Sequence, residues 1–426
     1  MKIIQAVYAI YYKYRSYSHS VKYLILSQII VIIFSFISTF VLIRSLTLEE
    51  YGLFVLVISL EGRFGVIALP GMNFVLQKAL LKGNNCYQII QKKILQVSFF
   101  IGLIIVAIAS VNLIIVDEYI GPFVFLNEFK WEFLIVAIFF IIPKNLNKYE
   151  IYLISIEEYR SLFFYRLLQV LLYFLFVACV AYIFNSLYYV LFGVFIYYLI
   201  LLIYTNKRLN NITYEKLVTE DCIDASNVLK DGYKYSLLNL NAFFFRFERI
   251  VLGTISPELL GLYHVAEKIP DLVKNALKNF ITPLLVKKGK GCKSGNFQWI
   301  KDNKLLLLLF GIGGLLLSYL LTHLLYMQIF TEEYADGMHY SYLLSIPIIF
   351  IFINTILNSY DIVQNDGSIY RKYYFFHSII FGVIAYIAIP LFGIMGMLYA
   401  VFGVTLLHIF CSINIYHDSN KSHDNV

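Results

Sequence analysis

The chain has 426 residues, of which 60% are hydrophobic and only 14% are charged, and its mean hydropathy is +0.73. A soluble domain is roughly 45–50% apolar and about 25% charged, so this composition excludes a soluble globular protein and predicts a polytopic membrane protein. The formal net charge of +7 does not imply a nucleic-acid partner, because the basic residues follow the pattern that membrane topology produces.

Twelve apolar segments are long enough to cross a bilayer as helices, since a spanning helix needs about 20 residues. They cover residues 21–43, 51–75, 94–116, 132–152, 161–184, 186–205, 233–255, 258–285, 304–326, 341–358, 371–391 and 393–415. The first segment is too long for the apolar core of a signal peptide, so no cleaved leader is expected. The predicted fold class is an all-α integral membrane protein with about 12 transmembrane helices.

Lysine and arginine gather in alternate loops, as the positive-inside rule describes for cytoplasmic loops. The loops after the second and the eighth span are the richest, with Lys78, Lys82, Lys92, Lys93, Lys287, Lys288, Lys290, Lys293, Lys301 and Lys304. The opposite loops hold almost nothing basic apart from Arg44 and Lys130. Both termini are therefore expected on the cytoplasmic side.

A polar stretch near the middle divides the chain into two halves of six spans each. The predicted organisation is a cytoplasmic N-terminal segment, an N-lobe with spans one to six, a cytoplasmic linker, a C-lobe with spans seven to twelve, and a cytoplasmic tail. These parts cover residues 1–20, 21–205, 206–232, 233–415 and 416–426 in that order. Because six spans is an even number, both lobes enter the membrane from the same side and are parallel repeats, a common transporter design.

A short sequence repeat supports this division. Leu46–Phe54 aligns with Ile255–Tyr263 when position 52 is matched to position 261, an offset of 209 residues, and in each half the segment links the first span to the second. Thr47, with a glutamate three residues later, predicts a capping box at the start of a helix. Ser256, followed by proline, predicts the equivalent N-cap in the second half.

Spans seven and eight carry charges that a lipid-facing helix would not tolerate, because a charge near the bilayer centre costs at least ~2.5 kcal/mol. In the eighth span four charged residues recur at helical spacing and fall within a stripe about 60° wide: Glu267, Asp271, Lys274 and Lys278. Such a stripe predicts a helix face in contact with water. The alternative is that its carboxylates only form structural ion pairs, with Lys274 or with Arg63 from the other half.

Three stretches of the chain carry a family resemblance. They are the hairpin at 44–54, the seventh span and its turn at 249–269, and the stretch Ile-Pro-Leu-Phe-Gly-Ile-Met-Gly at 389–396. They are similar to the polysaccharide and O-antigen flippases of the multidrug/oligosaccharidyl-lipid/polysaccharide (MOP) exporter superfamily, and with the twelve-span layout the resemblance covers essentially the whole chain. Many members place an acidic residue before the arginine that matches Arg249, and here Glu248 keeps that charge on a longer side chain.

The resemblance implies a MATE-like fold of two six-helix lobes and a flippase activity. Such proteins move an undecaprenyl-pyrophosphate-linked oligosaccharide, a precursor of O-antigen, capsule or exopolysaccharide, across the bacterial cytoplasmic (inner) membrane by alternating access. The expected partners are this lipid-linked oligosaccharide, membrane lipids and the polysaccharide polymerase machinery, and the protein itself is expected to be a monomer. No cofactor is expected, with H⁺ or Na⁺ as the candidate coupling ion.

A pyrophosphate head group suits a cavity lined by cations, because Arg binds it through two hydrogen bonds and Lys adds a mobile charge. The candidate substrate-binding residues are Arg63, Arg246, Arg249, Lys268, Lys274 and Arg44, the last at an outer helix end where membrane head groups are the alternative ligand. The candidates for ion coupling are the acidic residues Glu61, Glu267 and Asp271. Three other basic residues near cytoplasmic helix ends are expected to snorkel to the surface, namely Arg166, Lys234 and Lys278.

Two other functions remain open. An integral-membrane polysaccharide polymerase or glycosyltransferase handles the same lipid, but it would need a large extramembrane segment, and the chain shows no catalytic motif and no metal-ligand spacing among its 5 cysteines. We therefore expect a protein that is not an enzyme, with no catalytic or metal-binding residues. A drug exporter of the same superfamily is the second alternative, against which the arginines argue because typical drug substrates are cationic.

Overall fold

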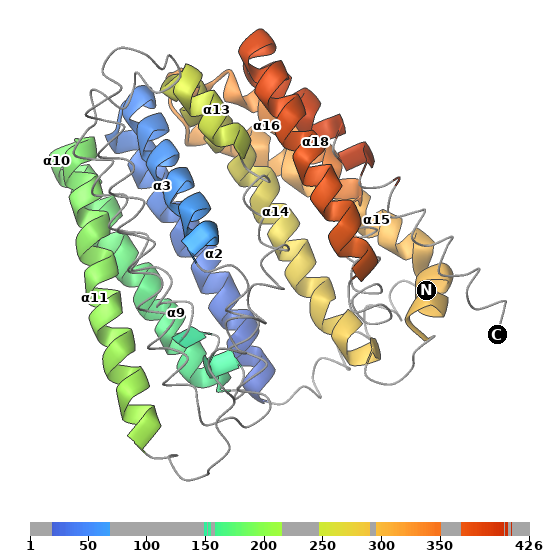
Figure 1. The fold of residues 1–426 in the computed structure, drawn as a ribbon, viewed down its shortest axis with the longest axis horizontal. Helices are drawn as coiled ribbons and strands as arrows, with labels where there is room; N and C mark the ends of the chain where they lie inside the picture. The colour runs from blue at the N-terminus through green and yellow to red at the C-terminus, as the bar shows by residue number, and fades with distance from the viewer. Residues whose placement is uncertain are drawn as a thin grey trace. The chain divides into compact units, whose positions relative to one another are not determined.

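The computed structural model describes residues 19–68, 149–150, 152–154, 158–214, 247–289, 295–350, 368–403, 405–407 and 410. Every regular element in these ranges is helical (Figure 1). The elements are α2 (His19–Ser45), α3 (Leu48–Ala68), α9 (Tyr159–Tyr173), η2 (Phe174–Ala178), α10 (Cys179–Phe184), α11 (Leu187–Tyr214), α13 (Phe247–Ile255), α14 (Pro257–Gly289), α15 (Gly295–Gln328), η3 (Glu332–Tyr334), α16 (Gly337–Ser345), η4 (Ile346–Phe350) and α18 (Ser368–Phe392).

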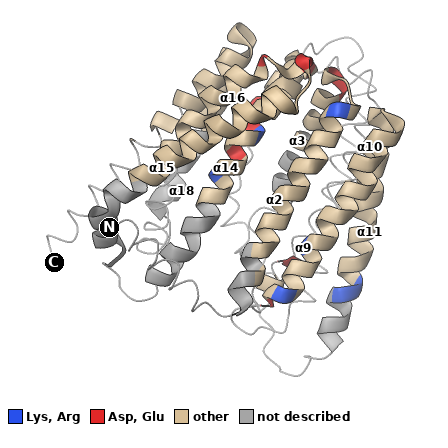
Figure 2. Ribbon diagram, turned by 180° about the vertical axis from the view of Figure 1, so that it is seen from behind, with Lys and Arg blue, Asp and Glu red and all other residues tan. Residues whose placement is uncertain are grey.

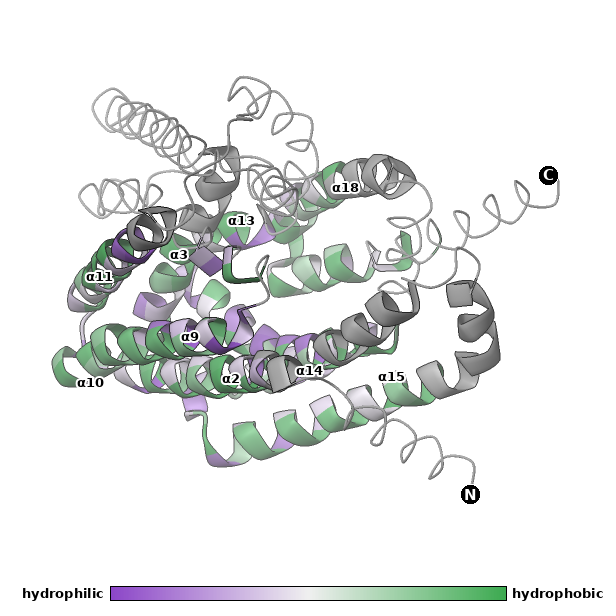
Figure 3. Cartoon of the chain, turned by 90° about the horizontal axis from the view of Figure 1, so that it is seen from below, coloured by the Kyte–Doolittle hydropathy of each residue, from purple (hydrophilic) through white to green (hydrophobic). Residues whose placement is uncertain are grey.

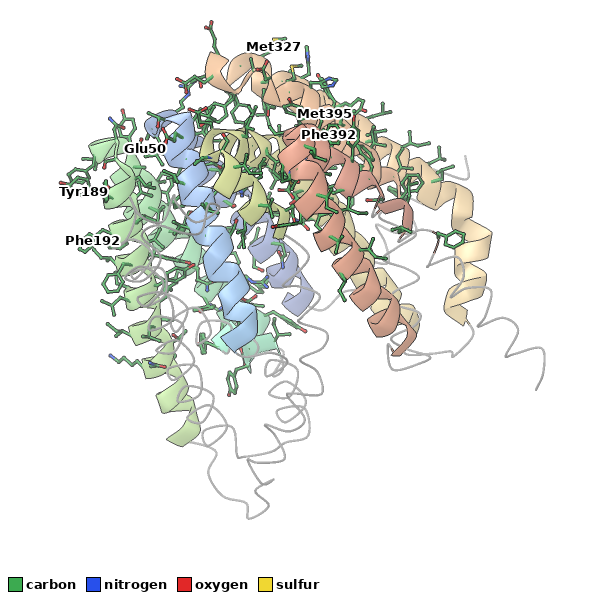
Figure 4. The ribbon with its side chains drawn as sticks, turned by 45° about the horizontal axis from the view of Figure 1, so that its top comes forward. Glu50, Tyr189, Phe192, Met327, Phe392 and Met395 are labelled. Atoms are coloured by element: carbon green, nitrogen blue, oxygen red, sulfur yellow. The ribbon has the colours of Figure 1, made fainter. Side chains whose placement is uncertain are left out.

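The apolar helices confirm a multi-pass membrane protein. Within the described part of the chain, four stretches are long and apolar enough to cross a bilayer: Leu26–Ser45, Tyr159–Phe184, Leu187–Arg208 and Leu308–Gln328. Hydrophobic residues dominate these helices (Figure 3), and large side chains such as Tyr189 and Phe192 of α11 point outward (Figure 4). The count of twelve spans stays a prediction, because the spans expected at 94–116 and over most of 132–152 lie outside the described residues.

The described helices form two compact units, the first of which contains α2, α9, η2, α10 and α11. In this unit α2 packs along α9, and α11 packs against η2, a π-helical turn within the span Tyr159–Phe184. Gly193 of α11 permits the close approach, because a Cβ there would collide with the carbonyl oxygen of Phe176. Asn185, in the left-handed conformation with φ of 45°, ends α10 and turns the chain into α11.

The second unit contains α3, α13, α14, α15, η3, α16, η4 and α18. Here α14 packs against α15 and α16, while α13 packs against α14 and α18. Two pairs of buried hydroxyls join α15 to α16, Ser318 to Ser345 at 2.7 Å and Thr322 to Ser341 at 3.0 Å. Hydrogen bonds of this kind hold helices together where apolar side chains gain little over lipid.

The helix starts expected in the repeat are confirmed. The Thr47 backbone N–H donates to a carboxylate oxygen of Glu50 (3.2 Å), and the Glu50 N–H donates to the Thr47 hydroxyl (3.2 Å), which is a complete capping box. At the start of α14 the Leu259 N–H donates to the Ser256 hydroxyl (3.2 Å), and Pro257 occupies the first helical position.

The helix α3 groups with the second unit, although the sequence analysis counted it as span two of the N-lobe. The chain passes from the first unit to the second between Ser45 and Leu46, just before α3 begins. This grouping follows from the contacts that α3 makes with α14, described below. The predicted linker at 206–232 is described only up to residue 214, so the domain boundaries stay a prediction.

Candidate functional site

A buried ion pair joins α13 to α14 in the second unit. The Arg249 guanidinium on α13 donates to a carboxylate oxygen of Glu267 on α14 at 2.5 Å, and the two side chains are only 9% and 17% exposed. Glu248, the neighbour of Arg249 on α13, is also buried. The acidic residue before the arginine therefore shares the interior of the unit with it, and the guanidinium is held by a carboxylate of the chain itself.

The same helix carries a second and looser ion pair. Lys274 Nζ lies 3.9 Å from a carboxylate oxygen of Asp271, with side chains 46% and 25% exposed. Figure 2 shows the acidic and basic residues following one another along α14. The sequence analysis offered Lys274 or Arg63 as partners of the two carboxylates, and Lys274 does lie beside Asp271. Glu267 pairs with Arg249, and the alternative partner Arg63 has its side chain outside the described part of the chain.

For several other candidate residues the structure does not describe the side chain. Arg63 and Glu61 lie on α3, where their side chains are outside the described part, and Arg246 precedes the described start of α13. Lys268 lies on α14 and is partly exposed. Arg44, at the end of α2 in the first unit, lies with its guanidinium 4.8 Å from the centre of the Phe40 ring. Five candidate site residues therefore belong to the second unit and have described side chains: Arg249, Glu267, Lys268, Asp271 and Lys274. The chamber expected between the two lobes stays a prediction.

The two copies of the sequence repeat lie against each other at the start of α3 and α14. A Cβ added to Gly52 would collide with the carbonyl oxygen of Pro257 and lie 3.2 Å from the Gly261 nitrogen. A Cβ added to Gly261 would lie 2.7 Å from the Leu48 oxygen and 3.2 Å from the Gly52 nitrogen. Glycine at both positions is what allows the two backbones to approach this closely.

Aromatic side chains surround this crossing. The Tyr51 hydroxyl lies 2.8 Å from Nδ1 of His264, within hydrogen-bond distance, and the Tyr51 ring stands edge-on to that of Tyr334 in η3. Tyr51 and Tyr334 are fully buried. The sequence analysis did not single out either Tyr51 or His264. The repeat that contains Tyr51 marked the region, but nothing in the sequence indicated that its two copies contact each other.

The first unit contains a charged cluster around Arg166 of α9. Arg166 of α9 was expected to snorkel to a surface, and this expectation was wrong. The Arg166 side chain is 11% exposed, and its guanidinium donates to Glu150 through Nε (3.1 Å) and Nη2 (2.5 Å) and to the Ser27 hydroxyl of α2 at 2.9 Å. Arg166 therefore ties α9 to α2 and to the segment at 149–150.

Comparison with known proteins shows a likeness of fold to a solved structure. No protein-family model matches the chain, and no curated protein matches its sequence. Among solved structures it is similar to that of a multidrug resistance MATE family transporter of the MOP superfamily in an inward-facing conformation, with a TM-score of 0.56 and 12% identity over 95% of this chain and 98% of the other. The chain therefore has the all-helical fold of a MATE transporter, as the resemblance implied, and the likeness at this identity concerns the fold alone.

Proposed function

We propose that the protein is a flippase that moves an undecaprenyl-pyrophosphate-linked oligosaccharide across the bacterial cytoplasmic membrane by alternating access, with both termini in the cytoplasm. The observation that carries the proposal is the charged stripe of α14. Asp271 and Lys274 on this helix remain partly exposed, with side chains 25% and 46% exposed. Lipid penalises charge at such a place, so the stripe is best explained by contact with water and with an ionic substrate.

The ion pair between Arg249 and Glu267 supports an exchange mechanism. A pyrophosphate offers several oxygens to which a guanidinium can donate two parallel hydrogen bonds. When the head group reaches α13, it replaces Glu267 as the acceptor of Arg249, while Lys268 and Lys274 add positive charge. Glu267 is then released and can take up a proton, which makes it the favoured coupling residue, with Asp271 next.

A deletion strain tests the proposed function directly. Loss of the gene should cause lipid-linked repeat units to accumulate in the inner leaflet while no repeat unit reaches the cell surface. If the protein were a polymerase, single repeat units would still appear at the surface of the deletion strain. Complementation with the wild-type chain should restore export, and complementation with Arg249→Gln should not.

A drug exporter is the second candidate, and one observation favours it. Glu267 neutralises Arg249 in the interior, so the unit presents fewer unopposed cations than the sequence suggested. The similar solved structure is that of a multidrug transporter. The same deletion strain separates the candidates: hypersensitivity to cationic dyes with normal surface polysaccharide would support the exporter, and lost polysaccharide with unchanged dye sensitivity would support the flippase.

A further inference from the structure

The contact between α3 and α14 has an internal symmetry. With the offset of 209 residues, Gly52 corresponds to Gly261, and Leu48 corresponds to Pro257. Gly52 meets Pro257, and Gly261 meets Leu48. Each copy of the repeat therefore uses the same position to touch the same position of the other copy, as the two halves of a two-fold symmetric interface do.

The symmetry does not extend to the side chains. On one side of the crossing Tyr51 and His264 are within hydrogen-bond distance. The residues that the offset places on the other side are Leu260 and Val55, both apolar and buried. The crossing is thus a close backbone contact with a polar contact between Tyr51 and His264, here called the latch, on one side and buried apolar side chains at the equivalent positions on the other.

The chain connects this crossing to both units. The helix α2 belongs to the first unit and ends at Ser45, and α3 begins at Leu48 in the second. Only Leu46 and Thr47 separate the two helices, so α3 is tied covalently to the first unit while it packs on the second. Separation of the two helices at this crossing leaves the backbone hydrogen bonds within each helix intact.

We propose that the crossing of α3 and α14 is the outer gate of the transporter, closed in this structure, with the Tyr51–His264 contact as its latch. The proposal rests on the proposed transport function and on the predicted topology, which places the helix starts at Thr47 and Ser256 on the outer side. In each cycle α3 separates from α14, the latch breaks, and the buried faces around Leu260 and Tyr51 become accessible from outside. Regaining the glycine contact closes the gate.

The test uses the accessibility of a buried reporter. Leu260→Cys is placed in a chain whose five native cysteines are replaced by serine, and labelling by a membrane-impermeant maleimide is measured in intact cells. Gly52→Ala and Gly261→Ala each add a Cβ that the closed crossing cannot contain. Both should raise the labelling rate about tenfold, since the rate follows the population of the open state.

The matched control is Gly313→Ala on α15, because a Cβ at Gly313 has no heavy atom within 4 Å. It makes the same chemical change in a spanning helix and should leave the labelling rate of the reporter unchanged. An immunoblot of the same cells corrects the labelling rate for protein amount. Unchanged labelling of Leu260→Cys in both glycine variants, or an equal rise in Gly313→Ala, overturns the proposal.

A second variant covers the case in which the glycine variants do not fold. Tyr51→Phe keeps the ring in its buried place and removes only the latch hydroxyl, so it should raise labelling of the reporter by a smaller factor than Gly52→Ala, and no rise contradicts the latch. Neither measurement needs the substrate. If labelling of the reporter rises as expected but the wild-type chain does not restore polysaccharide export, the flippase function is refuted and the gate is not. If export is restored but the labelling stays unchanged, only the gate is refuted.

Discussion

Arg249 and Glu267 hold opposite charges in a place that water hardly reaches, so each depends on the other. Removal of one partner from a buried pair costs about 3–5 kcal/mol, because the remaining charge is left uncompensated. We expect Glu267→Ala to lower the thermal unfolding temperature of the protein in detergent and to reduce the folded fraction in membranes. Size-exclusion chromatography after heating measures both effects.

The looser pair on α14 provides the control. Lys274 is 46% exposed and lies 3.9 Å from Asp271, and exposed pairs of this kind contribute only about 0–1 kcal/mol. Lys274→Ala should therefore unfold close to the wild-type temperature. If it unfolds as early as Glu267→Ala, the difference in burial between the two pairs does not control stability.

Exchanging the charges of Arg249 and Glu267 separates the effect of the ion pair on stability from its effect on transport. The double variant Arg249→Glu/Glu267→Arg should recover part of the stability lost in Glu267→Ala, since a pair is restored. It should not recover polysaccharide export, because the guanidinium now projects from α14 instead of α13. Full export in the exchanged variant would show that the position of the guanidinium is irrelevant to the substrate.

Sequence reasoning at this scale identified the charged residues and the pairing of Asp271 with Lys274 within one helix, but not the partner of Glu267 on the next helix. The spacing of Glu267, Asp271 and Lys274 depends only on the geometry of one helix, so a shared stripe could be predicted. The pairing of Glu267 with Arg249 depends on how α13 packs against α14, and helical spacing says nothing about that. Arg166 was misjudged for the same reason, because its partner Glu150 comes from outside its own helix.

Among the elements, the π-helical turn η2 and the helix α11 fit together through one glycine. A Cβ at Gly193 would collide with the carbonyl oxygen of Phe176, and overpacking of this kind typically costs about 1–3 kcal/mol. Gly193→Ala should therefore unfold at lower temperature than Gly313→Ala, whose added Cβ meets nothing. Equal unfolding temperatures would mean that α11 can shift at no cost.

The hydroxyl pairs between α15 and α16 should contribute less to stability than the packing at Gly193. Hydrogen bonds between spanning helices contribute about 0.6 kcal/mol on average in double-mutant cycles. A cycle of Ser318→Ala and Ser341→Ala, which belong to different pairs, should be close to additive. A cycle of Ser318→Ala and Ser345→Ala should show a coupling of about that size, and a coupling of zero would mean that the 2.7 Å contact adds nothing to stability.

Element boundaries were the part of the fold that sequence chemistry predicted best. Thr47 and Ser256 have side chains that satisfy free backbone N–H groups, so both helix starts could be located from local sequence. The π-helical turn could not, because nothing in Phe174–Ala178 distinguishes it from ordinary apolar helix, and its packing partner α11 lies outside that segment.

At the scale of the whole molecule, the predicted topology can be checked with two exposed positions. Glu332 lies in the acidic segment expected outside, and Arg208 lies near the cytoplasmic end expected for α11. In a chain without native cysteines, Glu332→Cys should react with an impermeant maleimide in intact cells, and Arg208→Cys should react only after the membrane is opened. The reverse pattern would invert the orientation and place the crossing of α3 and α14 on the inner side.

The fold as a class followed from composition and span length, whereas its central contact did not. A repeat at an offset of 209 residues shows that two segments are equivalent, and equivalent segments in parallel lobes need not meet. Gly52 and Gly261 are in contact because both helix starts lie where α3 crosses α14, which is a property of tertiary packing. The same packing explains why α3 groups with the second unit.

The segment η3 lies, on the predicted topology, on the outer side of the membrane, where its surface can be observed. Glu332 and Glu333 are exposed, while Tyr334 between them and the next helix is buried against Tyr51. Any movement that draws Tyr51 away must change the surface that this short acidic segment presents. A nanobody selected for that surface would therefore report the movement of Tyr51, and by fixing Tyr334 in place it would hold Tyr51 in its buried position.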